Sequence, residues 1–538
     1  MEASNMDLFT GSQENPEVNI TAASTTPPVA EETTYTAEEA IEHLGFGKFQ
    51  WGMLLYVGLI WFADAMELMM LSFIGPAVRG EFHLDANSES VLTSCVFVGM
   101  ILGSSFWGAL ADTRGRRPAF LYTALGSAAF AYLSAAAPNF WVLLGMRTML
   151  GIGLAGTTVG DTLFLELIPK SQRGRWMMAL GLFWTLGSIS EAALAWWLLS
   201  DHGWRVLLAA SATPLALLLL LFPLLPESPR YLLVKGQREA AEKVLQRIAE
   251  VNGKALPAGK LVAAAASDLN ERASQLAAEV SKGAEGAMSS LKKLGQDMGT
   301  AASRLLAPQL RTTTLLLAST WLLNMMGYYG IVLLATEIHL TPDTASGVAE
   351  AGAAAASSTI GLTSEDFKNI LITSAGELPA LFVALAGMEV LGRRTTVAVA
   401  LGGCALATGL LTTDPSGLNF TALMFVGRLL ISVAFNTLMV YTKELFPTSL
   451  RSLGLGTCNA IGRAGGMIAP FIVIKLCHGG QAHTAELVLA GFCGVAAIAV
   501  SLVSRETLGQ PLADTEQEQA SNYALLDAGS SEEKRALL

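Results

Sequence analysis

The sequence predicts an all-α membrane protein with twelve transmembrane helices in two six-helix pseudo-repeats. Hydrophobic residues make up 52% of the 538 positions and charged residues 15%, against roughly a quarter charged in soluble domains. Long apolar runs recur along the chain, most of them near the ~20 residues that a helix needs to cross a bilayer. A set of charged residues also occurs twice, almost a fixed distance apart. Most of the chain is therefore expected to lie in a lipid bilayer, as a duplicated helical bundle.

The apolar runs fall into two groups of six, one in each half of the chain. The first six runs are 51–78, 91–111, 118–137, 141–165, 176–199 and 204–224, and the last six are 312–336, 369–390, 395–412, 420–442, 453–476 and 483–503. The remaining segments are polar, acidic or of low complexity. We therefore predict five regions: a disordered cytosolic N-terminal tail (1–45), an N-terminal six-helix bundle (46–230), a cytosolic central loop with surface helices (231–308), a C-terminal six-helix bundle (309–506) and an acidic cytosolic tail (507–538).

Five landmarks define the duplication. They are Gly108, Arg147, Glu166, Arg173 and Glu227 in the first half, and Gly387, Arg428, Glu444, Arg451 and Glu506 in the second. The differences between matching positions are 279, 281, 278, 278 and 279. Chance does not keep five offsets in step, so each half is a copy of one membrane bundle. A parallel duplication of this kind is typical of secondary transporters.

The basic residues orient the chain, because cytoplasmic loops retain an excess of Lys and Arg. They concentrate in alternate loops: Arg114, Arg116 and Arg117, then Lys170, Arg173 and Arg175, then Arg393 and Arg394, then Lys443 and Arg451. These loops are therefore predicted to be cytosolic, and both termini with them.

Composition and motifs argue against several other classes of protein. The net charge of −11 resides largely in tails and loops, and no basic cluster indicates nucleic acid. The five cysteines lie in or beside apolar runs without paired spacing, so we expect packing residues rather than disulfides or a metal site. The sequence has no nucleotide loop, metal-ligand spacing or nucleophile motif. We expect no enzyme, no cofactor and no bound metal.

Three motifs resemble those of the major facilitator superfamily. The loop GALADTRGRR at 108–117 is similar to the signature loop of that superfamily, and Glu166 to Arg173, like Glu444 to Arg451, is similar to its paired Glu-x6-Arg elements. PESPR at 226–230 resembles the motif after the sixth helix in the sugar-porter and organic-ion branches. The resemblance covers about 45–510. One departure is Arg505 before Glu506, where the family usually has Pro, and it is expected to affect only a helix end.

Within the superfamily the chain resembles the plant-type organic cation/carnitine transporters of the synaptic-vesicle-2-related group, which includes nicotinate carriers. The resemblance is carried by Tyr35-Thr36 with Glu38-Glu39-Ala40, by residues 45–50, by residues 63–73 and by Tyr328-Tyr329-Gly330. Asp64 stands where we would expect Glu in plant members, and the acid is preserved. The resemblance implies a small organic ion as substrate. We also expect protons as the coupling ion and a carrier that works as a monomer.

The repeated charges at the cytosolic ends are candidate gating residues. They are Asp112, Arg116, Arg117, Glu166 and Arg173 in the first half, and Glu389, Arg393, Arg394, Glu444 and Arg451 in the second. Such residues can form contacts in one conformation that break in another. The alternative is a set of topogenic charges in static ion pairs. We favour the gate because the acidic-plus-basic set recurs in both halves.

Ionisable residues that occur in only one half are candidates for binding substrate or a coupling ion, because a charge inside a membrane span is costly. They are Asp64, Glu67, Glu191, Glu377 and Arg463. Asp64 and Glu67 are three residues apart, hence on one helical face. Two carboxylates in an apolar setting cannot both ionise cheaply, so one is expected to carry a proton. The alternative is a pair of structural acids bonded to another helix or to backbone.

Arg463 has Trp184 at the matching position of the first half and so has no counterpart charge. A guanidinium grips a carboxylate through two parallel hydrogen bonds. The resemblance points the same way, since organic-anion carriers place Arg here and cation carriers an acid. Neutralisation of Glu67 or Glu191 by Arg463 is the open alternative. Tyr328 and Tyr329 are the best aromatic pair to stack on a flat ring or to cap a cation.

The sequence thus predicts a secondary active transporter, proton-coupled, of a small organic ion, with a nicotinate-like aromatic carboxylate favoured. An organic cation/carnitine transporter and a non-transporting membrane receptor or trafficking protein remain the alternatives. The plasma membrane is the default location. The C-terminal Leu537-Leu538 after acidic residues has the form of a dileucine sorting signal, which leaves a vacuolar or endosomal membrane open.

Overall fold

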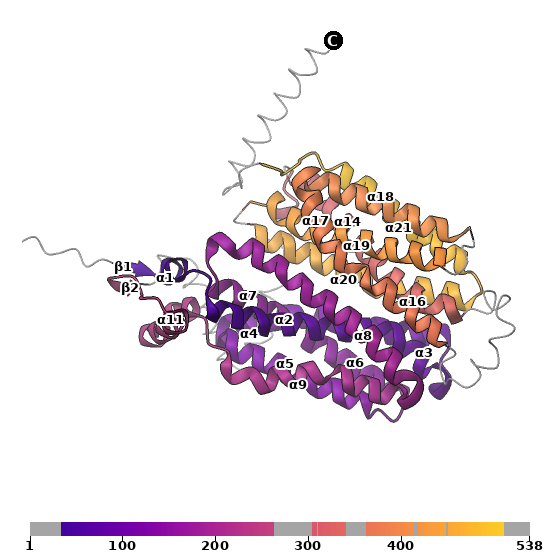
Figure 1. Ribbon diagram of the computed structural model, residues 1–538, viewed down its shortest axis with the longest axis horizontal. Coiled ribbons are helices and arrows are strands. Elements are labelled where there is room, and N and C mark those ends of the chain that lie inside the picture. The colour runs from indigo at the N-terminus through magenta and orange to yellow at the C-terminus, as the bar shows by residue number, and fades with distance from the viewer. Residues whose placement is uncertain are drawn as a thin grey trace, which may run out of the picture.

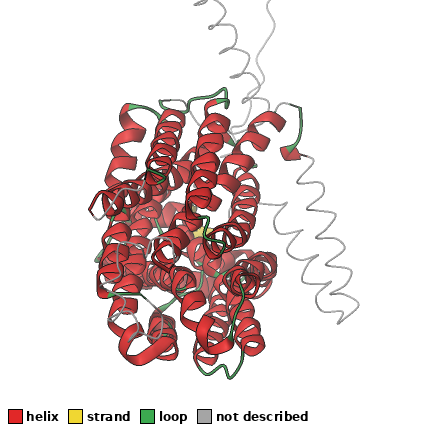
Figure 2. Cartoon of the chain, turned by 90° about the vertical axis from the view of Figure 1, so that its right-hand side faces the viewer, coloured by secondary structure: helices red, strands yellow, loops and turns green. Residues whose placement is uncertain are grey.

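Two helical bundles lie side by side in the computed structural model, which describes residues 34–262, 304–308, 310–340, 362–413, 418–447 and 450–509. Figure 1 shows the bundle of the first half in indigo to magenta below the bundle of the second half in orange to yellow. Figure 2 shows that helices make up almost all of the described chain. The predicted all-α class with two halves is confirmed.

The N-terminal half contains helices that match the first six apolar runs. They are α2 (Lys48–Met69) with α3 (Leu71–Phe82), α4 (Ala86–Arg114), α5 (Arg116–Ala135), α6 (Phe140–Leu154) with α7 (Thr157–Leu167), and, after the short η1 (Lys170–Gln172), α8 (Arg173–Ser211), α9 (Thr213–Leu221) and η2 (Phe222–Leu224). Polar residues cap the starts on the outer side: Asp85 accepts from the Ser88 amide at 3.0 Å and Asn139 from the Val142 amide at 3.0 Å.

The C-terminal half repeats this arrangement. Its helices are α14 (Arg311–Glu337) with η3 (Ile338–Leu340), α16 (Ser364–Ala375) with α17 (Glu377–Val390), α18 (Arg393–Leu411), α19 (Leu418–Leu445), α20 (Arg451–His478) and α21 (Ala482–Ser501). The start of α16 carries a capping box, in which Thr363 and Asp366 each bond the other's backbone amide.

The helices account for twelve membrane crossings. Within the described residues, ten helical stretches are long and apolar enough to span a bilayer. One of them, Lys170–Leu224, has 55 residues, and the positive φ of 77° at Gly203 breaks it into two crossings. Helix α5 adds the twelfth, because its 20 residues pack along α6 and α9 inside the bundle.

A small layer covers one end of the N-terminal half, on the side that the positively charged loops predict to be cytosolic; the two sides are named below by this prediction. It contains β1 (Thr34–Thr36), α1 (Ala37–Leu44), α10 (Pro229–Val234), α11 (Arg238–Asn252) and β2 (Lys260–Val262), and β1 pairs with β2 in parallel. In Figure 1 this layer lies at the left, at the opposite end from α3 and α16. Helix α11 lies in the central loop, where the sequence predicted surface helices.

Part of the segment predicted as a disordered tail (1–45) is folded: the described residues include 34–45. Helix α1 carries a capping box between Thr36 and Glu39, and its apolar face, which includes Ile41 and Leu44, is buried. A short helix such as α1 would not be stable in isolation, but its packing against α11 stabilises it here. Residues 1–33, the rest of the central loop from 263 to 303, and the tail from 510, with its dileucine, lie outside the described residues.

Candidate functional site

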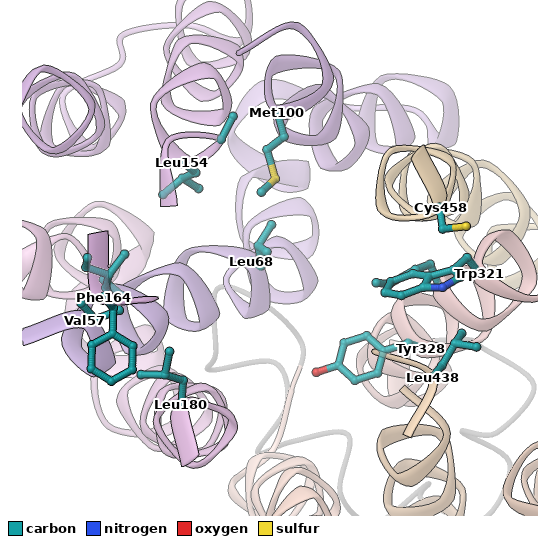
Figure 3. Packing of buried hydrophobic residues seen from close by; sticks show 14 of the residues in the cluster. Val57, Leu68, Met100, Leu154, Phe164, Leu180, Trp321, Tyr328, Leu438 and Cys458 are labelled. Atoms are coloured by element: carbon teal, nitrogen blue, oxygen red, sulfur yellow. The ribbon is translucent and has the colours of Figure 1, made fainter. Parts of the chain in front are cut away.

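A cavity lies between the two halves near the middle of the helices. Its empty space, including the part that opens to solvent, is about 880 Å³. It is lined from the N-terminal half by Trp61, Asp64, Leu68, Phe97, Met100, Thr157, Thr158, Asp161 and Trp184, and from the C-terminal half by Met325, Tyr328, Tyr329, Phe435, Met439, Asn459 and Arg463. Figure 3 shows Leu68 and Met100 on one side of this interface and Tyr328 on the other. Aromatic walls with a few polar groups are typical of a small-molecule site.

Two acids line the N-terminal side of the cavity. Asp64 of α2 accepts a hydrogen bond from the hydroxyl of Thr157, the first residue of α7. Asp161 lies one turn further along α7 and accepts from the Trp61 indole at 2.7 Å. Asp161 is not among the candidate site residues predicted from the sequence. Its spacing of four residues from Thr157 would have placed both on one helical face.

Arg463 lines the opposite side of the cavity. Its guanidinium donates to the Met100 carbonyl at 3.3 Å, and among the described residues no carboxylate lies within 4.0 Å of it. The neighbouring glycines bring α20 close to α14, because a Cβ at Gly465 would lie 2.3 Å from the Leu322 carbonyl oxygen. The expected alternative, neutralisation of Glu67 or Glu191 by Arg463, is not what the structure shows.

The predicted aromatic pair is divided between two roles. The Tyr328 hydroxyl donates to Glu377 at 2.7 Å and accepts from the Trp184 indole at 3.1 Å, so it links the two halves. Tyr329 packs edge-on against Phe97 with ring centroids 4.7 Å apart. Both rings line the cavity, as stacking on a substrate would require.

Glu377 lies behind Tyr328 rather than in the cavity wall. Its carboxylate pairs with the Arg428 guanidinium at 2.8 Å, and both side chains are almost fully buried. Arg428 also lies 5.5 Å from the Tyr328 ring centroid. The structure thus connects a buried ion pair to the cavity through one phenol.

Glu67 is not among the residues that line the cavity and lies inside the N-terminal bundle. It pairs with Arg147 at 2.7 Å, with each side chain 1% exposed. Glu191 lies close enough to Glu67 and Arg147 to interact with them electrostatically. One of its carboxylate oxygens accepts from Ser211 at 2.7 Å, while the other, like Nε and Nη2 of Arg147, has no hydrogen-bond partner among the described residues. Buried polar atoms without partners are costly unless a water or a proton serves them.

From the sequence, Arg147 and Arg428 are only landmarks of the repeat, yet in the structure each is the direct partner of a candidate acid. The internal repeat was the sign in the sequence that these two arginines are important, because they occupy matching positions in the two halves. Their acids do not match: Glu67 belongs to the first crossing and Glu377 to the eighth. The internal repeat alone therefore does not identify the pairs.

The candidate gating residues form contacts within each half in this conformation. Arg116 pairs with Asp112 at 3.1 Å and with Glu166 at 3.3 Å, and Arg393 pairs with Glu444 at 3.1 Å. Arg173 pairs with Glu38 of α1 at 3.1 Å rather than with Glu166.

The remaining four gating candidates form no ion pair with another described residue. Arg117 lies over the Phe222 ring, 5.1 Å from its centroid, and Arg394 donates to the Val503 carbonyl at 3.1 Å. Glu389 is exposed, and Arg451 has two guanidinium nitrogens without partners. The predicted Glu-x6-Arg elements thus do not act as paired residues in this conformation.

The same end of each half carries a repeated cap. Glu227 accepts from the Arg116 amide at 3.0 Å at the start of α5, and Glu506 accepts from the Arg393 amide at 2.7 Å at the start of α18. Gly115 and Gly392 precede these starts with φ of 107° and 83°, a region that favours glycine. A Cβ at either glycine would lie within 2.6 Å of the capping carboxylate.

Polar contacts between the halves lie at mid-membrane and on the outer side. Mid-membrane contacts are Trp184 to Tyr328, Arg463 to Met100 and Arg428 to Met69. Outer contacts are Ser94 to Met467, Ser90 to Pro470, Trp196 to Ser364, Arg79 to Glu337 and His478 to Glu89. Between described residues we find none on the cytosolic side. The outer side is therefore closed, and the halves are not joined by polar contacts at the cytosolic side.

The comparison with known proteins agrees with this architecture. The sequence profile of the sugar (and other) transporter family matches residues 29–349 and 353–518. The chain belongs to this family of the major facilitator superfamily. It is 36% identical over 490 residues to the organic cation/carnitine transporter 7 of Arabidopsis thaliana, covering 90% of this chain and 97% of that protein. It is 35% identical over 485 residues to the synaptic vesicle 2-related protein of Xenopus laevis, covering 90% and 83%.

Solved structures of the major facilitator superfamily share the fold. The inward-open xylose transporter XylE of E. coli superposes with a TM-score of 0.62 at 15% identity, covering 88% of this chain and 99% of that one. A partially occluded inward-open form gives 0.62 at 16% identity. Twelve crossings in two pseudo-repeats thus form a transporter of this superfamily, and the chain is a multi-pass membrane protein rather than an enzyme.

Proposed function

We propose that this transporter carries a small organic ion with a carboxylate, a nicotinate-like aromatic acid being favoured, by alternating access. The observation that carries the proposal is the Arg463 guanidinium, which lines the central cavity without a carboxylate partner among the described residues. A substrate carboxylate can supply the bidentate partner that the protein does not. Trp61, Trp184 and Tyr329 offer ring faces beside it.

An organic cation or a carnitine-like zwitterion is the second candidate. Asp64 and Asp161 line the same cavity, and carboxylates with aromatic neighbours attract a cation. The name of the Arabidopsis relative is consistent with this candidate. Uptake of labelled nicotinate, carnitine and tetraethylammonium by cells expressing the chain separates the candidates. A well-folded protein at the cell surface that takes up none of them would favour a receptor or trafficking role.

Proton coupling is proposed for the acids on α2 and α8. Glu67 and Glu191 lie near Arg147 in the N-terminal bundle, and buried atoms of Glu191 and Arg147 have no hydrogen-bond partner in the part of the chain that the structure describes. A proton on one of these acids changes the charge that Arg147 must balance. Asp64, which lines the cavity, can report substrate binding to Glu67 one turn away.

The cytosolic charges are proposed to form a gate in the opposite conformation. Asp112 is 67% exposed, and its ion pair among the described residues is with Arg116 of its own half, so it is available to contact the C-terminal half when the cytosolic side closes. We expect Asp112→Asn to slow uptake with little change in apparent affinity.

We further propose that the carrier works as a monomer in the plasma membrane, with vacuolar or endosomal membranes as the alternative. Imaging of a fluorescent fusion tests the location.

A further inference from the structure

The outer closure contains a group of charges that the substrate and coupling proposals do not use. Arg79 of α3 and Glu89 of α4 belong to the N-terminal half, whereas Glu337 of α14 and His478 of α20 belong to the C-terminal half. We call these four residues the outer cluster. The two carboxylates are buried, at 0% and 2% exposure, while Arg79 and His478 are 27% and 22% exposed.

One guanidinium serves both carboxylates. Arg79 donates from Nε and Nη2 to Glu89, at 3.0 Å each, and from the same Nη2 to Glu337 at 2.9 Å. Gly75 makes room for this arrangement, because a Cβ there would lie 2.5 Å from a Glu89 carboxylate oxygen. The guanidinium therefore holds an acid from each half in one buried site.

His478 completes the outer cluster from the C-terminal half. Its Nε2 lies 3.0 Å from Glu89 and 4.0 Å from Glu337. With a neutral imidazole, the four residues carry two negative charges and one positive charge. With one extra proton, on the imidazole or on a carboxylate, the charges balance. Because an uncompensated buried charge is costly, the closed arrangement favours the protonated form.

Opening of the outer side changes this balance. On opening, the N-terminal half keeps the Arg79–Glu89 pair, which is neutral. Glu337 and His478 move away from this pair with the C-terminal half and become exposed to the outer medium. The two acids then no longer share one guanidinium, so the demand for the extra proton falls. We propose that the outer cluster binds one proton from the outer medium and that this proton holds the outer side closed.

Few other titratable groups act on the outer cluster. On α20, Cys477 is buried and electrostatically coupled to Glu337 and Arg79. On α21, Glu486 is also coupled to Cys477 and lies 3.1 Å from His483 Nδ1. Lys475 turns toward the Phe471 ring, 5.6 Å from its centroid. None of these described residues forms an ion pair with Glu89 or Glu337.

A cysteine at the outer contact between the halves reports opening without any substrate. Ser94 is 3% exposed and donates to the Met467 carbonyl across that contact at 2.7 Å. Ser94→Cys is labelled with a membrane-impermeant thiol reagent added outside, at external pH from about 5.5 to 8. Exposed Asn87→Cys on the same side corrects for the pH dependence of the thiol reaction itself. The parent protein, whose five cysteines are buried, gives the background.

The corrected labelling rate is expected to rise with external pH, by up to roughly tenfold if opening lowers the proton affinity by about one pKa unit. Glu337→Gln removes one carboxylate, so the labelling rate should be slow and should no longer change with pH. His478→Arg carries a fixed positive charge and should keep labelling slow even at high pH. A profile in the parent that does not change with pH, or one that both variants leave unchanged at equal surface expression, overturns the proposal. Because the assay needs no substrate, failure of the substrate or coupling proposal does not affect its outcome.

Discussion

At the scale of single residues, substitution of Arg463 tests the proposed sign of the substrate's charge. If its guanidinium binds a carboxylate, Arg463→Lys keeps the charge and loses the bidentate geometry. We expect affinity for the carboxylate substrate to fall by about 1–3 kcal/mol, the range of a charge-assisted hydrogen bond. Arg463→Asp is expected to abolish anion uptake and to favour organic cations. Binding affinity and surface expression are measured together, and normal nicotinate affinity in a well-expressed Arg463→Ala variant would remove the anion site.

Glu67 provides the second prediction at this scale. Glu67→Gln keeps the size of the side chain and a hydrogen-bond acceptor for Arg147 but cannot release a proton. We expect reconstituted protein to lose accumulation driven by an inward proton gradient and to retain substrate exchange. Glu67→Asp, which keeps the acid, is the matched control and should accumulate substrate. If a stable Glu67→Gln protein still accumulates substrate under the inward proton gradient, Asp64 or Glu191 becomes the candidate for the coupling role instead.

The energetic cost of burying a charge made some of the ionisable residues around the cavity predictable from the sequence, but not their interaction partners. A charge inside an apolar run identifies Asp64 or Arg463 from sequence because burial without a function is expensive. Which residue faces a cavity depends on helix rotation and on the approach of the two halves. Thus Asp64 and Glu67, three residues apart, face different surroundings, and Arg147 became visible as a partner only in three dimensions.

At the scale of helices, the repeated caps tie the last residues of each half to the start of its third helix. Removing the charge of Glu506 weakens two hydrogen bonds to backbone amides at a helix N-terminus. We expect Glu506→Gln to destabilise the protein by about 1 kcal/mol, the usual value of a cap. Gly392→Ala should cost more, because the new Cβ meets the Glu506 carboxylate and φ is positive. Thermal unfolding in detergent measures both, with exposed Gly402→Ala in the interior of α18 as the control.

The helices themselves were predictable because apolar length and loop charge determine them. The breaks were harder to predict: Met70 divides the first crossing into α2 and α3, and Gly376 separates α16 from α17, inside runs that read as continuous. Helix α1 was missed for a different reason. Its short polar sequence is stable only through its cap and its contact with α11, which a local reading does not contain.

At the scale of the whole molecule, the distribution of contacts between the halves predicts which side reaches the cavity. Polar contacts join the halves on the outer side and at mid-membrane, and none joins described residues on the cytosolic side. Asn459 lines the cavity on α20, eight positions from the cytosolic start of that helix at Arg451. In this conformation, a reagent should therefore reach Asn459 from the cytosol.

Asn459→Cys tests this access directly. We expect a membrane-impermeant thiol reagent to label it faster in inside-out vesicles than in right-side-out vesicles, because the outer contacts block the opposite route. A bound substrate should slow the labelling, since Asn459 and Arg463 line the same cavity. Asn87→Cys on the outer surface should show the reverse preference between vesicles and confirms their orientation. Equal labelling of Asn459→Cys from both sides would mean that the outer contacts do not close the cavity, and faster labelling from outside would reverse the assigned conformation.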